Sequence, residues 1–194
     1  MTVFNVERFK SSLTNGGARP NQFLVSLSFP TYVPAQSIAV ARSPFLVNAA
    51  ELPGQTINPA IVYYRGREVK FAGDRTFAPW TISFLSDAEM SLRNAMEQWM
   101  NGMEDLVDKF GRLQPSEYQR DLDVAQLDRN GNILKAYKIS NAFPIDLSPV
   151  GLSFDANDQI SSTSVTFTYQ TFTTTNNPLA GTVDFAGIFR GAIG

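Results

Sequence analysis

The chain has 194 residues, which is enough for one sizeable hydrophobic core and leaves little room for two. It contains no Cys and no His, so it lacks disulfides, thiolate metal sites, most zinc sites and the commonest general base. This composition disfavours an enzyme, and no cofactor or metal is expected.

The net charge is -2, and the basic residues form no dense cluster, which disfavours specific binding to nucleic acid. Charged residues make up 18% of the chain, below the ~25% typical of soluble domains, and a surface poor in charge is typical of proteins that bury it against partners. No apolar run approaches the ~20 residues of a membrane span, and no secretory signal is visible. We expect a soluble protein that is made in a cytoplasm and does not enter membranes.

The first quarter of the chain predicts a short helix followed by two strands. Apolar residues at helical spacing predict the helix over 5–13, and alternating apolar residues predict a strand over 23–29. A second strand is expected over 45–50. Between the strands, the segment 30–44 is rich in Pro, Ala and Ser, which indicates a surface loop or a partly mobile insertion.

A hairpin and an unusual junction follow. The β-rich segments 61–64 and 68–72 flank Arg65-Gly66-Arg67, which predicts a hairpin. Its second strand leads into the stretch 71–80, where a glycine, an adjacent carboxylate and guanidinium, and two large aromatic residues occur close together: Gly73, Asp74, Arg75, Phe77 and Trp80. A backbone turn is expected at the glycine, and a further strand is expected over 80–84.

The main helix is predicted from its cap and its apolar stripe. Ser86-Asp87-Ala88-Glu89 has the pattern of a capping box, so a helix is expected to begin there. An apolar stripe continues to Phe110, and Asn101-Gly102 interrupts it, which predicts an end or a kink followed by a shorter helical piece. Met90 and Met100 fall off the stripe and are candidates for an interface.

The last third predicts a loop and more strands. The segment 111–119 is expected to be a loop, and the strands 122–127 and 133–139 flank Asn130-Gly131, a strong hairpin signal. Phe143-Pro144 is expected to end the second of these strands.

One more strand is predicted over 164–172, and 173–194 is expected to be a tail that docks on something. The acidic segments 128–131 and 155–158 resemble pieces of calcium loops, but turn chemistry explains them better. Many strands with a single capped helix predict a mainly β, α+β fold: an antiparallel β-sandwich or barrel with one main α-helix packed at its side. Its exposed strand edges must be blocked or paired, and pairing with identical neighbours would produce a ring.

The junction carries a family resemblance. Ala72-Gly73-Asp74-Arg75-Thr76-Phe77, followed by Trp80-Thr81, resembles the corresponding stretch of the major tail tube proteins of contractile-tailed bacteriophages. The likeness keeps its order from about Ala18 to Phe172 and includes three further motifs and a closing run: Ala18-Arg19-Pro20-Asn21-Gln22-Phe23, Leu52-Pro53-Gly54, Pro115-Ser116-Glu117-Tyr118, and Leu152 to Tyr169.

The resemblance implies a structural virion protein whose subunits form hexameric rings that stack into the hollow tube inside a contractile sheath. It implies as partners further copies of the chain, the tail sheath protein, the tape measure protein, and baseplate and tube-terminator proteins. DNA would pass through the lumen without specific binding, and assembly would take place in the host cytoplasm. The family is similar to the tube subunits of type VI secretion systems and of phage-like bacteriocins, and it offers no catalytic residues to carry over.

A single tail tube domain is expected over 1–172, with an insertion at 30–44 and a C-terminal extension at 173–194. These two segments are longer than the compact family pattern, so their contacts are not implied by the resemblance; we expect them to decorate the tube or lock adjacent rings. The candidate assembly residues are Gly73, Asp74, Arg75, Phe77, Trp80, Arg19 and Asn21. Asp74 and Arg75 are expected to order the junction by local hydrogen bonds or to reach across a subunit boundary.

Two alternatives remain open at this point. A protein that initiates the tube at the baseplate, or a tube subunit of a related injection system, would share the fold. The alternative of another class is a monomeric β-rich binding module, in which tyrosines such as Tyr63, Tyr64, Tyr137 and Tyr169 line a platform, although Tyr is also a normal strand residue.

Overall fold

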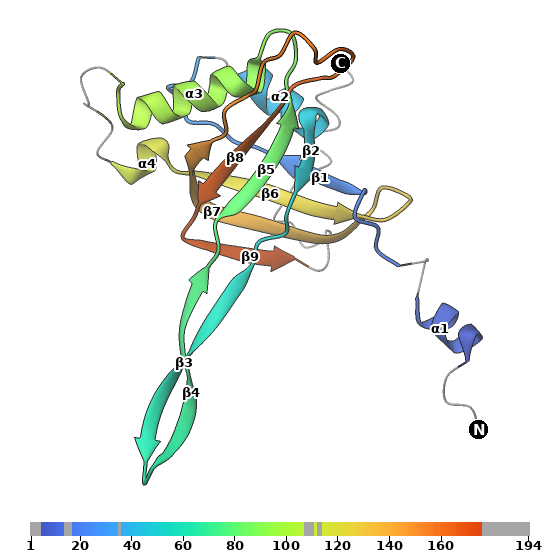
Figure 1. Ribbon diagram of the computed structural model, residues 1–194, viewed down its shortest axis with the longest axis vertical. Coiled ribbons are helices and arrows are strands. Elements are labelled where there is room, and N and C mark those ends of the chain that lie inside the picture. The colour runs from blue at the N-terminus through green and yellow to red at the C-terminus, as the bar shows by residue number, and fades with distance from the viewer. Residues whose placement is uncertain (1–4, 14–16, 35, 107–110, 112–113, 176–194) are drawn as a thin grey trace.

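The structure is a computed structural model that describes residues 5–13, 17–34, 36–106, 111 and 114–175. A body of two antiparallel sheets carries a long hairpin that points away from it (Figure 1). The elements, in chain order, are α1 (Val6–Ser12), β1 (Phe23–Ser26), α2 (Gln36–Leu46), β2 (Val47–Ala50), β3 (Gln55–Tyr64), β4 (Arg67–Phe77), β5 (Trp80–Leu85), α3 (Ser91–Met103), α4 (Pro115–Tyr118), β6 (Arg120–Leu127), β7 (Ile133–Leu147), β8 (Ser162–Thr168) and β9 (Thr171–Thr175).

The two sheets of the body share the long strand β7. Its first part pairs with β6 and β9, and β1 lies beyond β6, which gives a first sheet in the order β1-β6-β7-β9. From Phe143 onward β7 pairs with β8, in a second sheet that continues through β5 to β2. The change of sheet occurs at Asn141, which has a φ of 57° and donates its backbone N–H to the Asp121 carboxylate at 3.1 Å.

The core lies between the sheets and under α3. Trp80, Phe84, Trp99 and Phe167 are each no more than 1% exposed. The Trp99 ring from α3 lies 5.9 Å from the Phe167 ring of β8, so helix and sheet share one aromatic cluster. Burying each such side chain stabilises the fold by roughly 1.5–3 kcal/mol. The predicted fold class, mainly antiparallel β with one main helix at its side, is confirmed.

Several predicted elements are confirmed. The N-terminal helix is α1, whose first turn is capped by the Asn5 side chain, which accepts from the backbone N–H of Glu7 at 3.1 Å. Both predicted hairpins form: β3 pairs with β4, and β6 pairs with β7. The strand expected over 80–84 is β5, and the one expected over 23–29 is the shorter β1.

The segment 30–44 is not a loop, because it contains most of the helix α2. Pro44 lies in the last turn of α2. Because proline has no backbone N–H, the carbonyl of Val40 does not receive the helical hydrogen bond that another residue at position 44 would donate. The hydroxyl of Ser43 donates to that carbonyl instead, at 3.0 Å, and accepts from the backbone N–H of Leu27 at 3.3 Å. Ser43 is fully buried, so a polar residue that suggested a loop in fact fixes the helix against the end of β1.

The main helix begins later than its sequence pattern predicts. No capping box forms at residues 86–89: α3 starts at Ser91, and Asp87 accepts from both the backbone N–H and the hydroxyl of Ser91 at 2.7 Å. Arg42 of α2 holds both carboxylates of the segment, bonding to Asp87 and lying 2.6 Å from Glu89. Burial works against the charged form of Asp87, but the bonds from Ser91 and Arg42 lower its pKa.

The helix ends at Met103, one residue after Gly102, so the end predicted near Asn101-Gly102 is confirmed. Gly102 faces the ring of Tyr32, whose hydroxyl donates to the carbonyl of Trp99 at 2.8 Å, and a Cβ at this position would clash with that ring. The glycine is therefore a packing residue. Residues 104–106 are not helical, and the rest of the predicted helical piece lies outside the described residues.

Three further boundaries differ from prediction near the C-terminus. β7 does not end at Phe143-Pro144 but passes through it with an irregularity before Asp146, and the expected loop 111–119 contains α4. The strand expected over 164–172 is two strands in different sheets, β8 and β9, separated by Tyr169-Gln170. Of the predicted tail, 173–175 belong to β9 and 176–194 lie outside the described residues.

Candidate assembly surfaces

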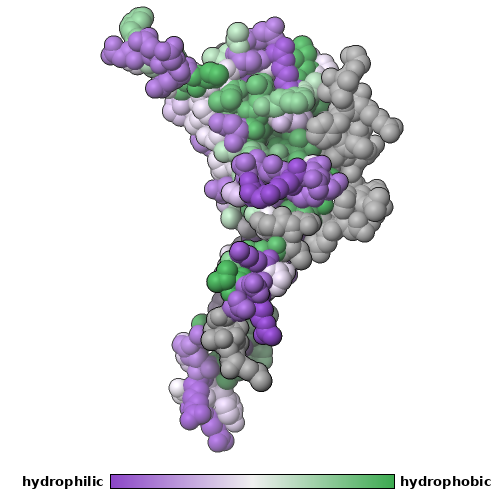
Figure 2. All heavy atoms as spheres, turned by 90° about the vertical axis from the view of Figure 1, so that its right-hand side faces the viewer, coloured by the Kyte–Doolittle hydropathy of each residue, from purple (hydrophilic) through white to green (hydrophobic). Residues whose placement is uncertain are grey.

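The hairpin of β3 and β4, residues 55–77, is named the arm. It pairs with no other described strand, and every residue of its two strands is exposed except Phe77. Arg65 and Gly66 form its two-residue turn, and both have positive φ, 48° and 80°, as the turn type that matches strand twist requires. Figure 2 shows the arm as a narrow projection that carries both hydrophobic and hydrophilic side chains. An isolated two-stranded hairpin is at best marginally stable in water, so we expect the arm to be stabilised by contact with another chain.

The outer half of the arm has one mainly apolar face, while its other face mixes Ile61 and Tyr63 with charged side chains. Residues directly opposite each other share a face, and the register places Tyr64 with Arg67, Val62 with Val69, and Ala60 with Phe71. We name the surface formed by Ala60, Val62, Tyr64, Val69 and Phe71 the apolar arm face. Its larger members are well exposed, with Phe71 at 58% and Val62 at 53%.

The opposite face of the arm satisfies its own polar groups. The Glu68 carboxylate lies 3.8 Å from the Lys70 ammonium and accepts from the Tyr63 hydroxyl at 3.3 Å. At the tip, the Arg65 guanidinium lies over the ring of Tyr64, 5.4 Å from its centre. Neither Arg65 nor Arg67 pairs with a carboxylate among the described residues.

The predicted junction residues divide between the base of the arm and its shaft. Phe77 packs at the base, with its ring 5.7 Å from Tyr169 and 5.5 Å from Phe172. Trp80 is buried in the core, with its ring 5.8 Å from that of Phe167. These two aromatic residues anchor the arm to the body.

The expected turn at Gly73 is wrong, because Gly73 lies inside β4. It sits where the register with β3 shifts, and a Cβ there would lie 2.5 Å from the carbonyl oxygen of Asn58. A glycine is needed for this close approach of two backbones. Asp74 and Arg75 follow it in the strand, both exposed, and neither side chain makes a hydrogen bond or ion pair with another described residue.

Arg19 and Asn21 lie away from the arm, in the segment that leads into β1. Both side chains are exposed, and the Arg19 carbonyl accepts from the backbone N–H of Gln22 at 3.3 Å and from the side chain of Gln126 at 3.4 Å. Within the described residues no hydrogen bond joins either residue to the arm, so the seven predicted residues do not form one site.

The first sheet has two open edges. β1 pairs only with β6, and β9 pairs only with β7, so in the described part of the chain each leaves one row of backbone groups without a strand partner. β1 and β9 are the outermost strands of this sheet and form its two opposite edges.

The face of this sheet that points away from the main core carries charge. Lys138 of β7 lies 3.0 Å from Asp121 of β6, and this bond raises the pKa of Lys138. Asp123, next along β6 on the same face, has one carboxylate oxygen that is buried without a hydrogen-bond partner in the described structure. Burial raises the pKa of Asp123 to about 6, although the nearby Lys138 opposes the shift.

A groove of about 1080 Å³ lies at the C-terminal end of α3, between that helix, α4 and the last part of β7. Its apolar lining includes Met100, Met103, Phe143, Ile145 and Leu147. Its charged lining, among the described residues, is entirely acidic: Glu97, Glu104, Asp105 and Asp146. The position of Met100 off the apolar stripe was the sequence signal for this surface. The groove itself joins residues of α3 to residues 143–147 of β7 and was not predicted.

The described residues hold no cluster of three or more side chains placed to bind a metal ion. None of the helices in that part of the chain has the length and hydrophobicity of a membrane span. The first acidic segment is a turn, in which the Asp128 carboxylate accepts from the backbone N–H groups of Asn130 at 2.7 Å and Asn132 at 2.8 Å.

Open sheet edges, a projecting arm and an acidic groove define a β-rich subunit suited to association with other chains. The family model of the phage tail tube protein matches residues 18–175, and the chain belongs to this family. The predicted family is thereby confirmed, and the chain is a tail tube protein.

Curated relatives agree with this assignment. The tail tube protein of Serratia phage KSP90 is 28% identical over 155 residues, which cover 79% of this chain and 87% of that protein. Tail tube protein gp19 of Enterobacteria phage T4 is 27% identical over 150 residues, covering 77% and 86%. Among solved structures, a chain of the PVC sheath-tube complex of an extracellular contractile injection system shares the fold with a TM-score of 0.59 at 14% identity, covering 90% of this chain and 99% of that one.

Proposed function

We propose that this chain forms hexameric rings that stack into the hollow inner tube of a contractile phage tail, the conduit through which the genome is delivered. It is a component of the virion, is assembled in the host cytoplasm and catalyses no reaction. The observation that carries the proposal is the pair of open edges, β1 and β9, on one sheet of a chain that belongs to the tail tube family.

The two open edges explain how a ring closes. If β1 of one subunit pairs with β9 of the next, the four-stranded sheet continues from subunit to subunit. Such a contact is heterologous, joining two different surfaces, and it closes when the rotation between subunits divides a full turn. Closure into one large barrel removes every exposed edge of this sheet.

The same arrangement assigns the wall of the lumen. One face of the first sheet packs on the core, so the face that carries Asp121, Asp123 and Lys138 lines the channel. With two carboxylates and one ammonium, this wall is neutral to acidic and does not hold passing DNA. A strongly basic inner wall in a reconstruction of the tube would refute this assignment.

The outer surface serves the other components of the tail. We propose contacts with the sheath protein around the tube, with the tape measure protein inside it, and with baseplate and terminator proteins at its ends. Support comes from a chain of the same fold in the PVC sheath-tube complex.

Negative-stain microscopy of the purified protein tests the proposal. Rings or tubes are the expected result, and persistent monodisperse monomers would favour a β-rich binding module instead. Copy number on intact particles separates the tube subunit from a tube initiator: we expect many stacked rings, whereas a single ring per particle would assign the chain to the baseplate end.

A further inference from the structure

One side of the arm carries both exposed apolar side chains and a basic side chain that has no carboxylate partner in the described structure. The apolar arm face is exposed along its length, and Arg67 lies at its outer end, directly opposite Tyr64. The carboxylate of the arm's outer half, Glu68, belongs to the other face, where it is engaged by Lys70 and Tyr63. A surface that fits this side of the arm must therefore supply both apolar contacts and negative charge.

The groove at the end of α3 supplies both. Its lining combines the side chains of Met100, Met103 and Ile145 with the carboxylates of Glu104 and Asp146. Neither of these two carboxylates pairs with a basic residue in the described structure. Methionines adapt their shape to a partner, which suits a groove that receives an extended strand pair.

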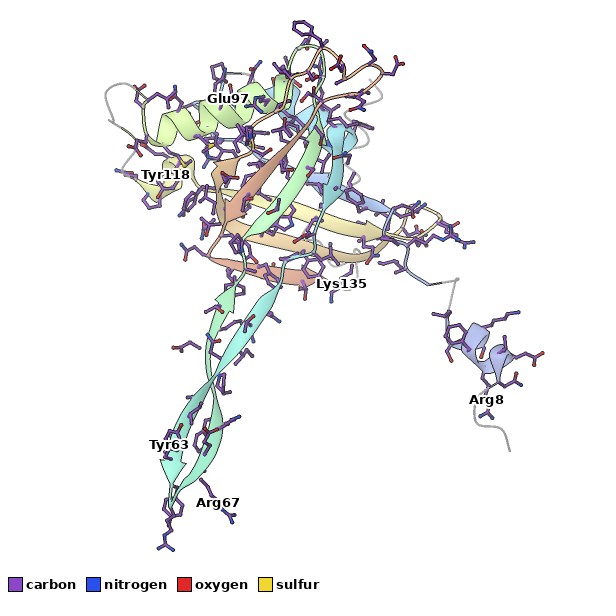
Figure 3. All side chains as sticks on the ribbon, in the orientation of Figure 1. Arg8, Tyr63, Arg67, Glu97, Tyr118 and Lys135 are labelled. Atoms are coloured by element: carbon purple, nitrogen blue, oxygen red, sulfur yellow. The ribbon has the colours of Figure 1, made fainter. Side chains whose placement is uncertain are left out.

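A subunit cannot fill its own groove with its own arm. Figure 3 shows Arg67 at the far end of the arm, and Glu97 and Tyr118 beside the groove on the opposite side of the body. A strand advances by about 3.3 Å per residue, so the arm reaches roughly 30 Å from its base, far enough to cross onto another subunit.

We propose that the groove of one subunit receives the arm of a second copy of this chain, with the apolar arm face on the methionines and with Arg65 and Arg67 on the groove carboxylates. This inference rests on the proposed function, because it needs subunits that assemble. Arm and groove are different surfaces at opposite ends of the molecule, so each subunit gives one arm and receives another, and the contact can be repeated without limit along a tube.

Cross-linking tests the contact directly. The chain has no Cys, so the double variant Arg67→Cys/Glu104→Cys carries its only two thiols at the arm tip and the groove. Treated with a short bis-maleimide after assembly, the tubes should give a ladder of covalent multimers on a denaturing gel, because each chain carries both a donor and an acceptor position. The matched control is Arg67→Cys/Asn130→Cys, with the second thiol at the β6–β7 turn, at the other end of β6 from α4. It should give no ladder.

Charge reversal tests the same contact without thiols. Arg65→Glu/Arg67→Glu and Glu104→Arg/Asp146→Arg should each abolish sedimenting tubes while leaving the melting temperature of the monomer unchanged, because all four side chains lie at the surface or in an open groove. Combining the four substitutions in one chain should restore at least part of the sedimenting material.

The outcomes separate this inference from the proposed function. Tubes that form but give no ladder with Arg67→Cys/Glu104→Cys, or as much with the control, overturn the docking and leave the tube function intact. Equal loss of tubes in the combined variant and in the two single-surface variants also overturns it. If the unmodified protein never forms rings or tubes, the proposed function fails first, and this inference fails with it.

Discussion

The indole N–H of Trp80 donates a hydrogen bond of 2.6 Å to the backbone carbonyl of Glu51. Glu51 precedes β3 and Trp80 begins β5, so this bond ties together the two segments from which the arm emerges. The backbone N–H of Ala78 adds a second link, to the carbonyl of Gly54 at 3.4 Å. The arm therefore has a base fixed to the core and a shaft exposed to solvent.

We expect Trp80→Phe to lower the free energy of unfolding by about 2–3 kcal/mol, because it leaves a cavity and a carbonyl without its partner. It should also weaken assembly at temperatures at which the body remains folded. Urea unfolding and sedimentation measure the two effects. Phe84→Leu is the control, since it loosens the same core without touching the base of the arm. Equal assembly by both variants at matched stability would contradict a role for Trp80 in holding the arm.

Gly73 gives a second prediction about the arm. In Gly73→Ala the new methyl group would lie 2.5 Å from the Asn58 carbonyl oxygen and 3.2 Å from the Ala60 nitrogen, so the strands of the arm must separate there. We expect tubes to be lost while the unfolding free energy of the body changes by less than about 0.5 kcal/mol, because the arm lies outside the core. Gly54→Ala is the control, because a Cβ at that position meets nothing within 4 Å. Sedimentation measures tube formation by both variants. Tubes formed by Gly73→Ala would show that the close approach of the two strands at Gly73 is not required for assembly.

Features with a local cause could be predicted from the sequence. The turns at Arg65-Gly66 and Asn130-Gly131 contain glycines with positive φ, and the hairpins around them formed as expected. Features decided by distant contacts could not. The buried hydroxyl of Ser43 bonds to both α2 and the end of β1, and Arg42 binds the Glu89 carboxylate that the expected capping box needed.

The candidate site shows the same division. Phe77 and Trp80 were identified by residue type, and both hold the base of the arm. The groove escaped prediction because α3 and the end of β7 are far apart in sequence. The position of Gly73 in a strand was missed because glycine marks a close backbone approach as well as a turn.

Arg75 tests whether the arm reaches across a subunit boundary. Its side chain is exposed and has no partner in the described part of its own subunit, so Arg75→Ala should change the unfolding free energy of the monomer by less than about 0.5 kcal/mol. If Arg75 bonds to a neighbouring subunit, the same change should raise the protein concentration needed for tubes about tenfold, the equivalent of about 1.4 kcal/mol. Light scattering against concentration measures this, with Arg129→Ala at the β6–β7 turn as the control. Unchanged assembly and unchanged monomer stability would show that Arg75 has no such role.

Asp123 predicts how stability depends on pH. Its pKa is about 6 in the folded chain against an ordinary value of 3.8, so the folded state binds the proton more tightly than the unfolded state does. The protonated carboxyl therefore contributes its full stability below about pH 4, and this contribution is lost as the pH rises through about 6. A shift of this size corresponds to roughly 3 kcal/mol, which the partial exposure of the side chain reduces to about 1 kcal/mol.

Asp123→Asn removes the titrating group, so the variant should be more stable than the parent by about 1 kcal/mol at pH 7–8, and this advantage should disappear by pH 4. Urea unfolding between pH 4 and 8 measures the difference, at protein concentrations too low for rings or tubes to form, so that assembly does not add to stability. Asp155→Asn, at an exposed position between β7 and β8, is the control and should follow the parent at every pH. An Asp123→Asn curve parallel to the parent curve would show that this carboxyl does not couple folding to pH.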